Sequence, residues 1–179
     1  MSDRLSIRGD EDGWQVFGKT PTDGNQRLFR SRAGWPTVRT YALEHQMMRL
    51  RCVLREDQVR DDGMPRSPKD LDEYEDRLLD ALTAADAEVY FIASITGDGN
   101  RDLFFTMRDP EELRAGIKAA KTDIDTFKLQ LAPLPDDKAA FLDALSLSGE
   151  QVQAAAAAGR LHNVSKLGGS GFLGKLFGR

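Results

Sequence analysis

Four carboxylates lie close together between residues 56 and 66, where they could hold a metal ion: Glu56, Asp57, Asp61 and Asp62. Carboxylate oxygens are the ligands that Mg²⁺ and Ca²⁺ prefer in proteins. The spacing does not match an EF-hand loop, and three arginines are interleaved with the acidic residues. The sequence therefore favours a solvated loop that holds no metal. A small metal-dependent hydrolase or nuclease that uses the acidic loop at Asp57–Asp62 is the alternative.

Nucleophilic catalysis needs a base beside a thiol or hydroxyl, and the chain offers few candidates for that pair. It has two histidines, His45 and His162, and one cysteine, Cys52. His45 precedes Cys52 by seven residues, an odd offset that places the two on opposite faces of a strand. A single cysteine forms no internal disulfide and no cysteine-based zinc cluster. We expect Cys52 to be a buried thiol, and we expect no catalytic residue, no metal and no cofactor.

A row of basic residues is the first candidate for a binding surface. Arg49, Arg51 and Arg55 alternate with apolar residues along one predicted strand, and four more arginines lie upstream, at positions 27, 30, 32 and 39. Such a row can bind an acidic protein partner or RNA. An RNA-binding sheet of the ribonucleoprotein type stacks bases on aromatic residues that follow a basic residue and a glycine. That signature is absent, and Phe104 and Phe105 fit a core, so RNA binding is the second alternative.

The last residues of the sequence are the other candidate for partner binding. As a helix, they would carry four large apolar side chains on one face: Phe172, Leu173, Leu176 and Phe177. Lys175 and Arg179 lie off that face. Exposed apolar side chains of this size indicate a docking segment. The sequence predicts that they pack on another chain or on a second copy; a weak membrane-surface contact and folding back on the same domain are the alternatives.

Hydrophobic periodicity predicts the elements that must position these residues. Period-two alternation indicates four strands, at residues 47–55, 88–96, 101–107 and 125–131. Apolar residues spaced by three and four indicate helices after Ser67–Pro68 and after Asp109–Pro110. The resulting order, βαββαβ, is the ferredoxin-like unit of the α+β class. It predicts an antiparallel sheet in which the first strand lies between the third and the fourth.

The core of this unit is predicted from the inward positions of its strands and helices. These residues are Leu50, Cys52, Tyr74, Leu78, Phe91, Ile95, Leu103, Phe105, Ile117, Phe127 and Leu129. An added N-terminal hairpin is predicted from strands at 14–18 and 26–32 around the turn at 21–25. The pattern at 37–43 is ambiguous and allows a continuation of the sheet. Two C-terminal helices are predicted, at 136–145 and from Ser148 to Gly159.

Four parts of the chain follow from this interpretation. A loose N-terminus covers residues 1–12 and the ferredoxin-like domain covers 13–145. A C-terminal helix covers 146–160, and a flexible tail with an apolar end covers 161–179.

Composition narrows the function classes. Hydrophobic content is 40% and charged content is 30%, as in ordinary globular proteins. The net charge is −4, and this acidic balance argues against a general nucleic-acid binder. No apolar run reaches the roughly 18 residues of a membrane-spanning helix, and the N-terminus has no secretory signal pattern. Together with the single cysteine, these features predict a cytoplasmic protein without a transmembrane segment.

The segment from Trp14 to about Leu131 resembles a group of bacterial domains of unknown function, and among them the domain of the ribonuclease E regulator B proteins. The resemblance is carried by three stretches: Trp14–Phe17, the acidic helix Asp72–Leu78, and Gly99–Phe105 followed by Arg108-Asp109-Pro110. It implies a ferredoxin-like fold, no known catalytic residues and action by binding an enzyme. The alanine-rich helix and the apolar end of the chain fall outside the pattern. The sequence thus favours a non-catalytic, regulatory protein-binding module.

Overall fold

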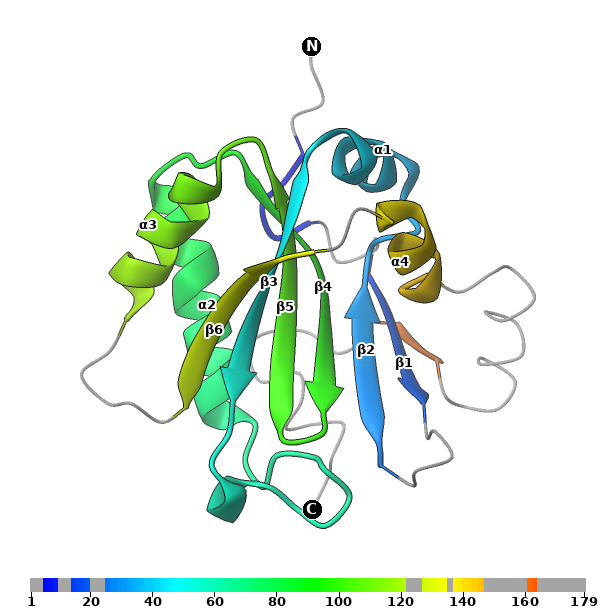
Figure 1. The fold of residues 1–179 in the computed structure, drawn as a ribbon, viewed down its shortest axis with the longest axis vertical. Coiled ribbons are helices and arrows are strands. Elements are labelled where there is room, and N and C mark those ends of the chain that lie inside the picture. Colours follow the sequence, from blue (N-terminus) through cyan, green and yellow to red (C-terminus); the bar gives the residue numbers. More distant parts are fainter. Residues whose placement is uncertain are drawn as a thin grey trace.

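The chain folds around one antiparallel sheet, which we describe from a computed structural model covering residues 5–9, 14–19, 25–121, 127–134, 137–146 and, as backbone, 161–163. Within this described part the sheet has seven strands in the order β6-β3-β5-β4-β2-β1-β7 (Figure 1). The strands are β1 Gln15–Lys19, β2 Arg27–Ser31, β3 Gln46–Val53, β4 Val89–Gly97, β5 Asn100–Met107, β6 Lys128–Pro133 and β7 Leu161–Asn163. The α+β class with an antiparallel sheet is therefore confirmed.

The centre of the sheet has the predicted strand order. β3 pairs with β5 on one side and with β6 on the other, so the first predicted strand lies between the third and the fourth. β4 and β5 form the predicted hairpin, whose turn residues Asp98 and Gly99 have φ angles of 51° and 72°. Positive φ is the geometry of a tight hairpin turn, which explains the Asp-Gly sequence there. The N-terminal hairpin is also confirmed, with Phe17 of β1 opposite Phe29 of β2.

One face of the sheet is covered by α2 (Lys69–Ala84) and α3 (Pro110–Ala120), and we call it the α2–α3 face. Asp109 caps α3 as predicted, because its side chain accepts a hydrogen bond from the backbone N–H of Glu111 at 2.9 Å. α2 begins one residue later than predicted, with Pro68 rather than Ser67 as its N-cap. A Cβ built on Gly116 of α3 would lie 2.5 Å from Leu82 of α2, so the glycine allows the two helices to pack closely.

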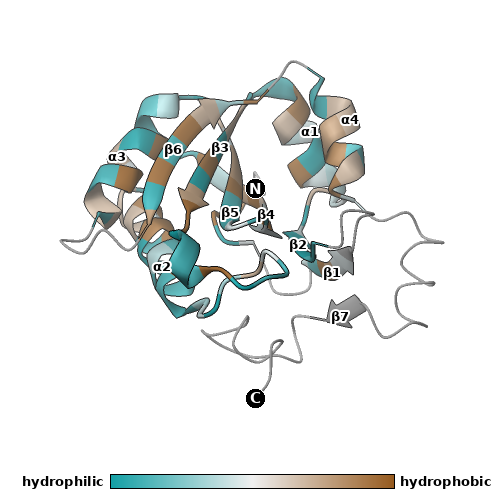
Figure 2. Cartoon of the chain, turned by 60° about the horizontal axis from the view of Figure 1, so that its bottom comes forward, coloured by the Kyte–Doolittle hydropathy of each residue, from teal (hydrophilic) through white to brown (hydrophobic). Residues whose placement is uncertain are grey.

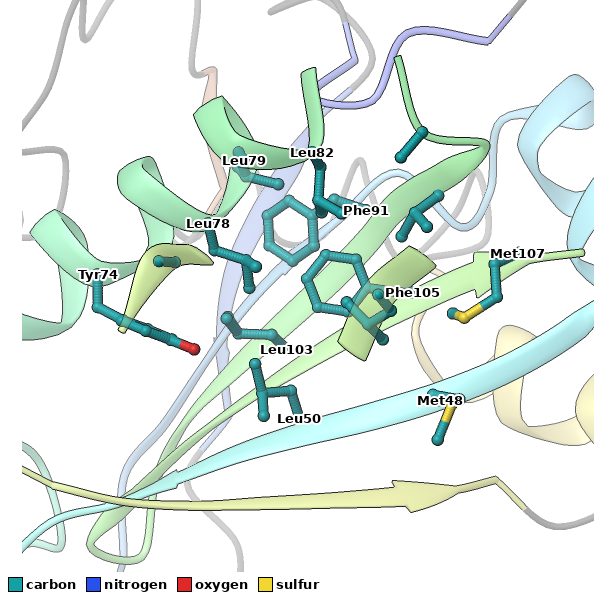
Figure 3. Close-up of a cluster of buried hydrophobic side chains, with 14 of the residues drawn as sticks. Met48, Leu50, Tyr74, Leu78, Leu79, Leu82, Phe91, Leu103, Phe105 and Met107 are labelled. Atoms are coloured by element: carbon teal, nitrogen blue, oxygen red, sulfur yellow. The ribbon is translucent and has the colours of Figure 1, made fainter. Parts of the chain in front are cut away.

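The main core fills the space between these helices and the sheet. Figure 3 shows leucines of α2 meeting Phe91, Leu103 and Phe105 from the strands. Seven of the predicted core residues are buried: Leu50, Cys52, Tyr74, Leu78, Phe91, Leu103 and Phe105. The other four, Ile95, Ile117, Phe127 and Leu129, are only half-buried. Ile117, Phe127 and Leu129 pack at the margin of this core, and Ile95 packs on the opposite face of the sheet.

The opposite face, which we call the α1–α4 face, carries the helices α1 (Pro36–Glu44) and α4 (Lys138–Ala144). α1 corrects the ambiguous interpretation of residues 37–43, which do not continue the sheet. Pro36 fits the first position of a helix, and the buried pair Val38 and Ala42 lies four residues apart on one helical face. α4 confirms the short helix predicted at 136–145. Its Phe141 packs on Phe104 of β5, with ring centroids 4.9 Å apart.

Two terminal segments differ from the predicted division of the chain. Residues 5–9 are not loose, because the backbone N–H of Phe91 donates to Ile7 O at 3.1 Å and Arg8 pairs with Asp76 of α2 at 3.0 Å. Residues 161–163, assigned to a flexible tail, form β7 along β1 and place Asn163 opposite Gln15. The rest of that tail, and residues 147–160 of the predicted C-terminal helix, lie outside the described residues.

Candidate functional site

The three arginines of the predicted basic row lie in three different environments. Arg51 makes a two-point pair with Asp102, directly opposite on β5, with Nε–Oδ1 2.7 Å and Nη2–Oδ2 2.8 Å. These hydrogen bonds raise the pKa of Arg51 above its usual value. Arg55 is exposed beyond the end of β3, where its Nε lies 3.2 Å from Asp57 Oδ1. Arg49 makes no ion pair with any described residue, and its Nε is buried without a hydrogen-bond partner.

Arg49 and Arg51 belong to the α1–α4 face. Met47 packs in the cluster beneath α1 and α4, and residues two apart along a strand share a face. Arg49 is opposite Phe104 of β5 and Ala132 of β6. In Figure 1, α1 and α4 lie over one end of this face, and no described helix lies in front of the other ends of β3, β5 and β4. Arg49 therefore lies at the margin between the covered and the uncovered part.

The uncovered part presents a row of side chains that crosses five strands. The register aligns Phe29 of β2, Ile95 of β4, Asp102 of β5, Arg51 of β3 and Gln130 of β6. We call this row, together with Arg49 and Lys128, the open surface. Phe29 and Ile95 are half-buried, and the Arg51 side chain is 31% exposed. The open surface thus combines half-exposed apolar side chains, one internal ion pair and one arginine without an acidic partner among the described residues.

The upstream arginines do not extend this row. Arg32 is buried and donates to backbone carbonyls, among them Phe91 O at 2.6 Å. Arg30 pairs with Glu75 of α2, across the other face of the sheet. Arg39 pairs with Asp143 of α4 at 2.7 Å, and Arg27 pairs with Asp98 of the hairpin turn at 2.7 Å. These four arginines hold the fold together, which spacing in the sequence did not reveal.

The acidic loop is ordered by arginines and by backbone hydrogen bonds. Asp62 pairs with Arg60 and accepts a hydrogen bond from the backbone N–H of Met64 at 3.1 Å. The Arg60 hydrogen bond lowers the pKa of the Asp62 carboxyl. The backbone carbonyl of Asp62 accepts from the N–H of Gln26 at 3.0 Å, which ties the loop to the start of β2. The described residues contain no group of three or more His, Cys, Asp or Glu that could hold a metal ion.

Cys52 and His45 are placed apart by β3. His45 stacks on Tyr41 with ring centroids 3.9 Å apart, and its Nε2 accepts a hydrogen bond from Arg108 at 3.2 Å. Cys52 lies six residues beyond Gln46 in β3, which at the usual strand rise is about 20 Å along the sheet. Cys52 is buried, and burial raises the pKa of its thiol to about 12. An uncharged buried thiol is a poor nucleophile, so the pair supports no covalent chemistry.

Sequence reasoning missed a buried ion network on the α2–α3 face. The Arg101 side chain is 2% exposed, and its Nη1 lies 2.8 Å from Asp72 Oδ1 and 3.5 Å from Glu75 Oε2 of α2. Its Nε donates to Thr96 Oγ1 at 3.2 Å, and its Nη2 is buried without a partner. Burial raises the pKa of Asp72 despite the nearby guanidinium. One signal in the sequence could have revealed this network. Arg101 precedes Leu103 and Phe105 at intervals of two residues, so its side chain is expected on the same, inward face of the strand.

The apolar end of the chain was the second predicted binding segment. Its residues Phe172, Leu173, Leu176 and Phe177 lie outside the described residues. None of the helices that the structure describes combines the length and the apolar character needed to cross a membrane.

Comparison with known proteins gives one result. No curated protein and no solved structure matches the chain significantly. One family model matches residues 12–145, and its description is a family of unknown function; it does not mention a ribonuclease regulator. The match covers the sheet from β1 to β6 and all four helices described above. The chain therefore belongs to the family of unknown function DUF695.

Proposed function

We propose that the protein is a non-catalytic binding module that recognises an acidic segment of another protein through the open surface. The observation that carries this proposal is Arg49, a half-buried arginine without an acidic partner among the described residues. A cation in this position is incompletely solvated, and a carboxylate from a partner would satisfy it with a charge-assisted hydrogen bond. Arginine is also over-represented among the residues that contribute most to binding energy at interfaces.

The surroundings of Arg49 fit such a partner. The open surface carries Arg49, Arg51 and Lys128 against the single carboxylate of Asp102, in a chain whose net charge is −4. A local basic excess on an otherwise acidic protein attracts an acidic segment. Phe29 and Ile95 add half-exposed apolar area beside the charges. Apolar contact combined with one arginine is typical of a small protein-binding site.

The fold supports a regulatory role within the same proposal. The order β6-β3-β5-β4, with α2 and α3 as the connections, is the order of a ferredoxin-like unit, to which we assign residues 46–133. The resemblance to the ribonuclease E regulator B domain implies action by binding an enzyme. We therefore infer a bacterial, cytoplasmic regulator that acts through its open surface rather than through chemistry.

Two alternatives have less support. A metal-dependent hydrolase would need several unpaired carboxylates side by side. Asp57 and Asp62 pair with Arg55 and Arg60, and the described residues contain no group of three or more metal-ligating side chains. An RNA-binding sheet would need exposed aromatic rings, whereas Phe104 is buried beneath Phe141 and only Phe29 remains half-exposed on the open surface. Both arrangements favour the protein partner.

The test compares Arg49→Glu with Arg114→Glu, a matched charge reversal on the exposed side of α3. A partner captured from cells with the wild-type protein is purified and titrated against each variant. We expect Arg49→Glu to weaken binding about 30-fold or more, as for a central interface arginine, and Arg114→Glu to have little effect. Thermal unfolding of each variant controls for folding.

Equal binding by wild type and Arg49→Glu would refute the proposal. A labelled single-stranded RNA is titrated in parallel by fluorescence anisotropy. If RNA binds the wild type and Arg49→Glu abolishes that binding, the RNA alternative replaces the protein partner.

A further inference from the structure

A second surface, distinct from the open surface, lies on the outer side of α1. Among the described residues, the large hydrophobic side chains most exposed to solvent are Trp35, 39% exposed, and Leu43, 41% exposed. At 100° per residue they lie within about 80° of each other on the helix, with Arg39 between them. Arg39 pairs with Asp143, so this side of α1 borders α4. Figure 2 shows hydrophobic bands on both helices.

Trp35 and Leu43 are unusual in their exposure. An exposed tryptophan is a frequent centre of protein contacts, since it supplies a large rigid apolar surface. Glu44 follows Leu43, is exposed and makes no ion pair with any described residue. We call Trp35, Leu43 and Glu44 the α1 patch. The patch fits a short amphipathic helix whose apolar face is large.

We propose that the segment 172–177 of the same chain covers the α1 patch. Phe172, Leu173, Leu176 and Phe177 would form one face of a helix. The apolar side chains would contact Trp35 and Leu43. The binding mode is a helix on an apolar patch, with the partner supplied by the chain itself.

The path of the chain brings this segment within reach. β7 ends at Asn163, opposite Gln15 of β1, which is itself opposite Ser31 of β2. Two strand spacings are about 10 Å, and the four residues from Ser31 to Trp35 add at most about 14 Å. The nine residues from Asn163 to Phe172 can span up to about 30 Å. The segment can therefore reach the α1 patch without any rearrangement of the sheet.

Connection through a short linker favours the same chain over a second copy. A linker of this length holds a tethered segment at an effective concentration in the millimolar range. A second copy at micromolar concentration competes poorly with it. In this proposal the segment occupies the α1 patch intramolecularly until a stronger ligand displaces it.

The experiment measures access to α1 in the full-length chain. Thr40→Cys places a thiol one turn before Leu43 and leaves Trp35 and Leu43 intact, while Cys52 is buried and its thiol pKa is about 12. Reaction with Ellman's reagent therefore reports on the introduced thiol alone. If the segment covers the patch nine-tenths of the time, Leu173→Asp/Phe177→Asp will accelerate this reaction about tenfold. Ser170→Asp is the matched control and should leave the rate unchanged.

A second reporter keeps the proposal testable if the cysteine variant does not fold. Trp14→Phe leaves Trp35 as the single tryptophan, and we expect its emission to shift to longer wavelength in the Leu173→Asp/Phe177→Asp variant. Equal access to Trp35 and to the introduced thiol with and without the aspartates would overturn the proposal. Protection that disappears on dilution would also overturn it, because the occupant would then be a second copy.

Discussion

The two faces of the sheet differ in how completely they are closed, although each carries two helices. The α2–α3 face is covered along its length, and its core includes fully buried side chains from β3, β4 and β5. The α1–α4 face is covered only near α1 and α4, and its other half presents the open surface. The arginines follow this division: Arg101 is fully enclosed in an ion network, whereas Arg49 and Arg51 are half-exposed. The α2–α3 face therefore holds the main core, and the other face carries the surface for which we propose recognition.

Adjacent phenylalanines of β5 give the sharpest test of this division. Phe105 points to the α2–α3 face and is 0% exposed, while Phe104 points to the α1–α4 face and is 3% exposed. Phe105→Ala should cost about 3–5 kcal/mol of the free energy of unfolding, because the rigid core cannot collapse around the cavity. Phe104→Ala should cost about 3 kcal/mol or less, since its cover, the short helix α4, can move inward. Urea unfolding of both variants checks this prediction.

An equal loss for the two variants would show that the α1–α4 face is packed as rigidly as the other. The open surface would then be the uncovered part of a rigidly packed face.

The arginines of the two faces provide the second test. Arg101→Met leaves Asp72 without its cation, while Glu75 keeps Arg30, so we expect a loss of about 3 kcal/mol, near the lower limit for breaking a buried pair. Arg51→Met removes the half-exposed pair with Asp102 and should cost about 1 kcal/mol or less. Denaturant unfolding measures both values. A larger loss for Arg51→Met than for Arg101→Met would reverse the assignment of the two faces.

The α2–α3 face could be predicted from the sequence because its signals are local. Alternation along β3 and the spacing of Leu71, Tyr74 and Leu78 each identify one buried side without reference to other parts of the chain. The other face was harder to predict. α1 has only nine residues, and Thr37, Val38 and Thr40 are β-branched, so its sequence fits a strand as well as a helix.

The candidate site was predictable in direction but not in detail. Alternation placed Arg49 and Arg51 on one face, and the structure confirms this. The pairing of Arg51 with Asp102 depends on strand register, and Arg101 meets Asp72 only after α2 packs on the sheet. Contacts between distant segments are set by tertiary packing, so spacing alone could not identify which arginine remains without an acidic partner.

The smallest predicted effect concerns the acidic loop, which is tied to the start of β2 beside the open surface. The Arg60 hydrogen bond lowers the pKa of Asp62, so the native state favours the ionised carboxylate. The stability that this provides is present above the ordinary aspartate pKa of about 4 and is lost as the pH falls through the lower, native value. Because Asp62 is partly exposed, its contribution is about 1 kcal/mol or less. Asp62→Asn should therefore lower the melting temperature by a few degrees at pH 7, and the difference from wild type should shrink toward pH 3.

Asp61→Asn, an exposed neighbour in the same loop, is the matched control and should follow the wild type at every pH. A constant difference between Asp62→Asn and wild type from pH 7 to pH 3 would mean that the Asp62 charge does not hold the loop.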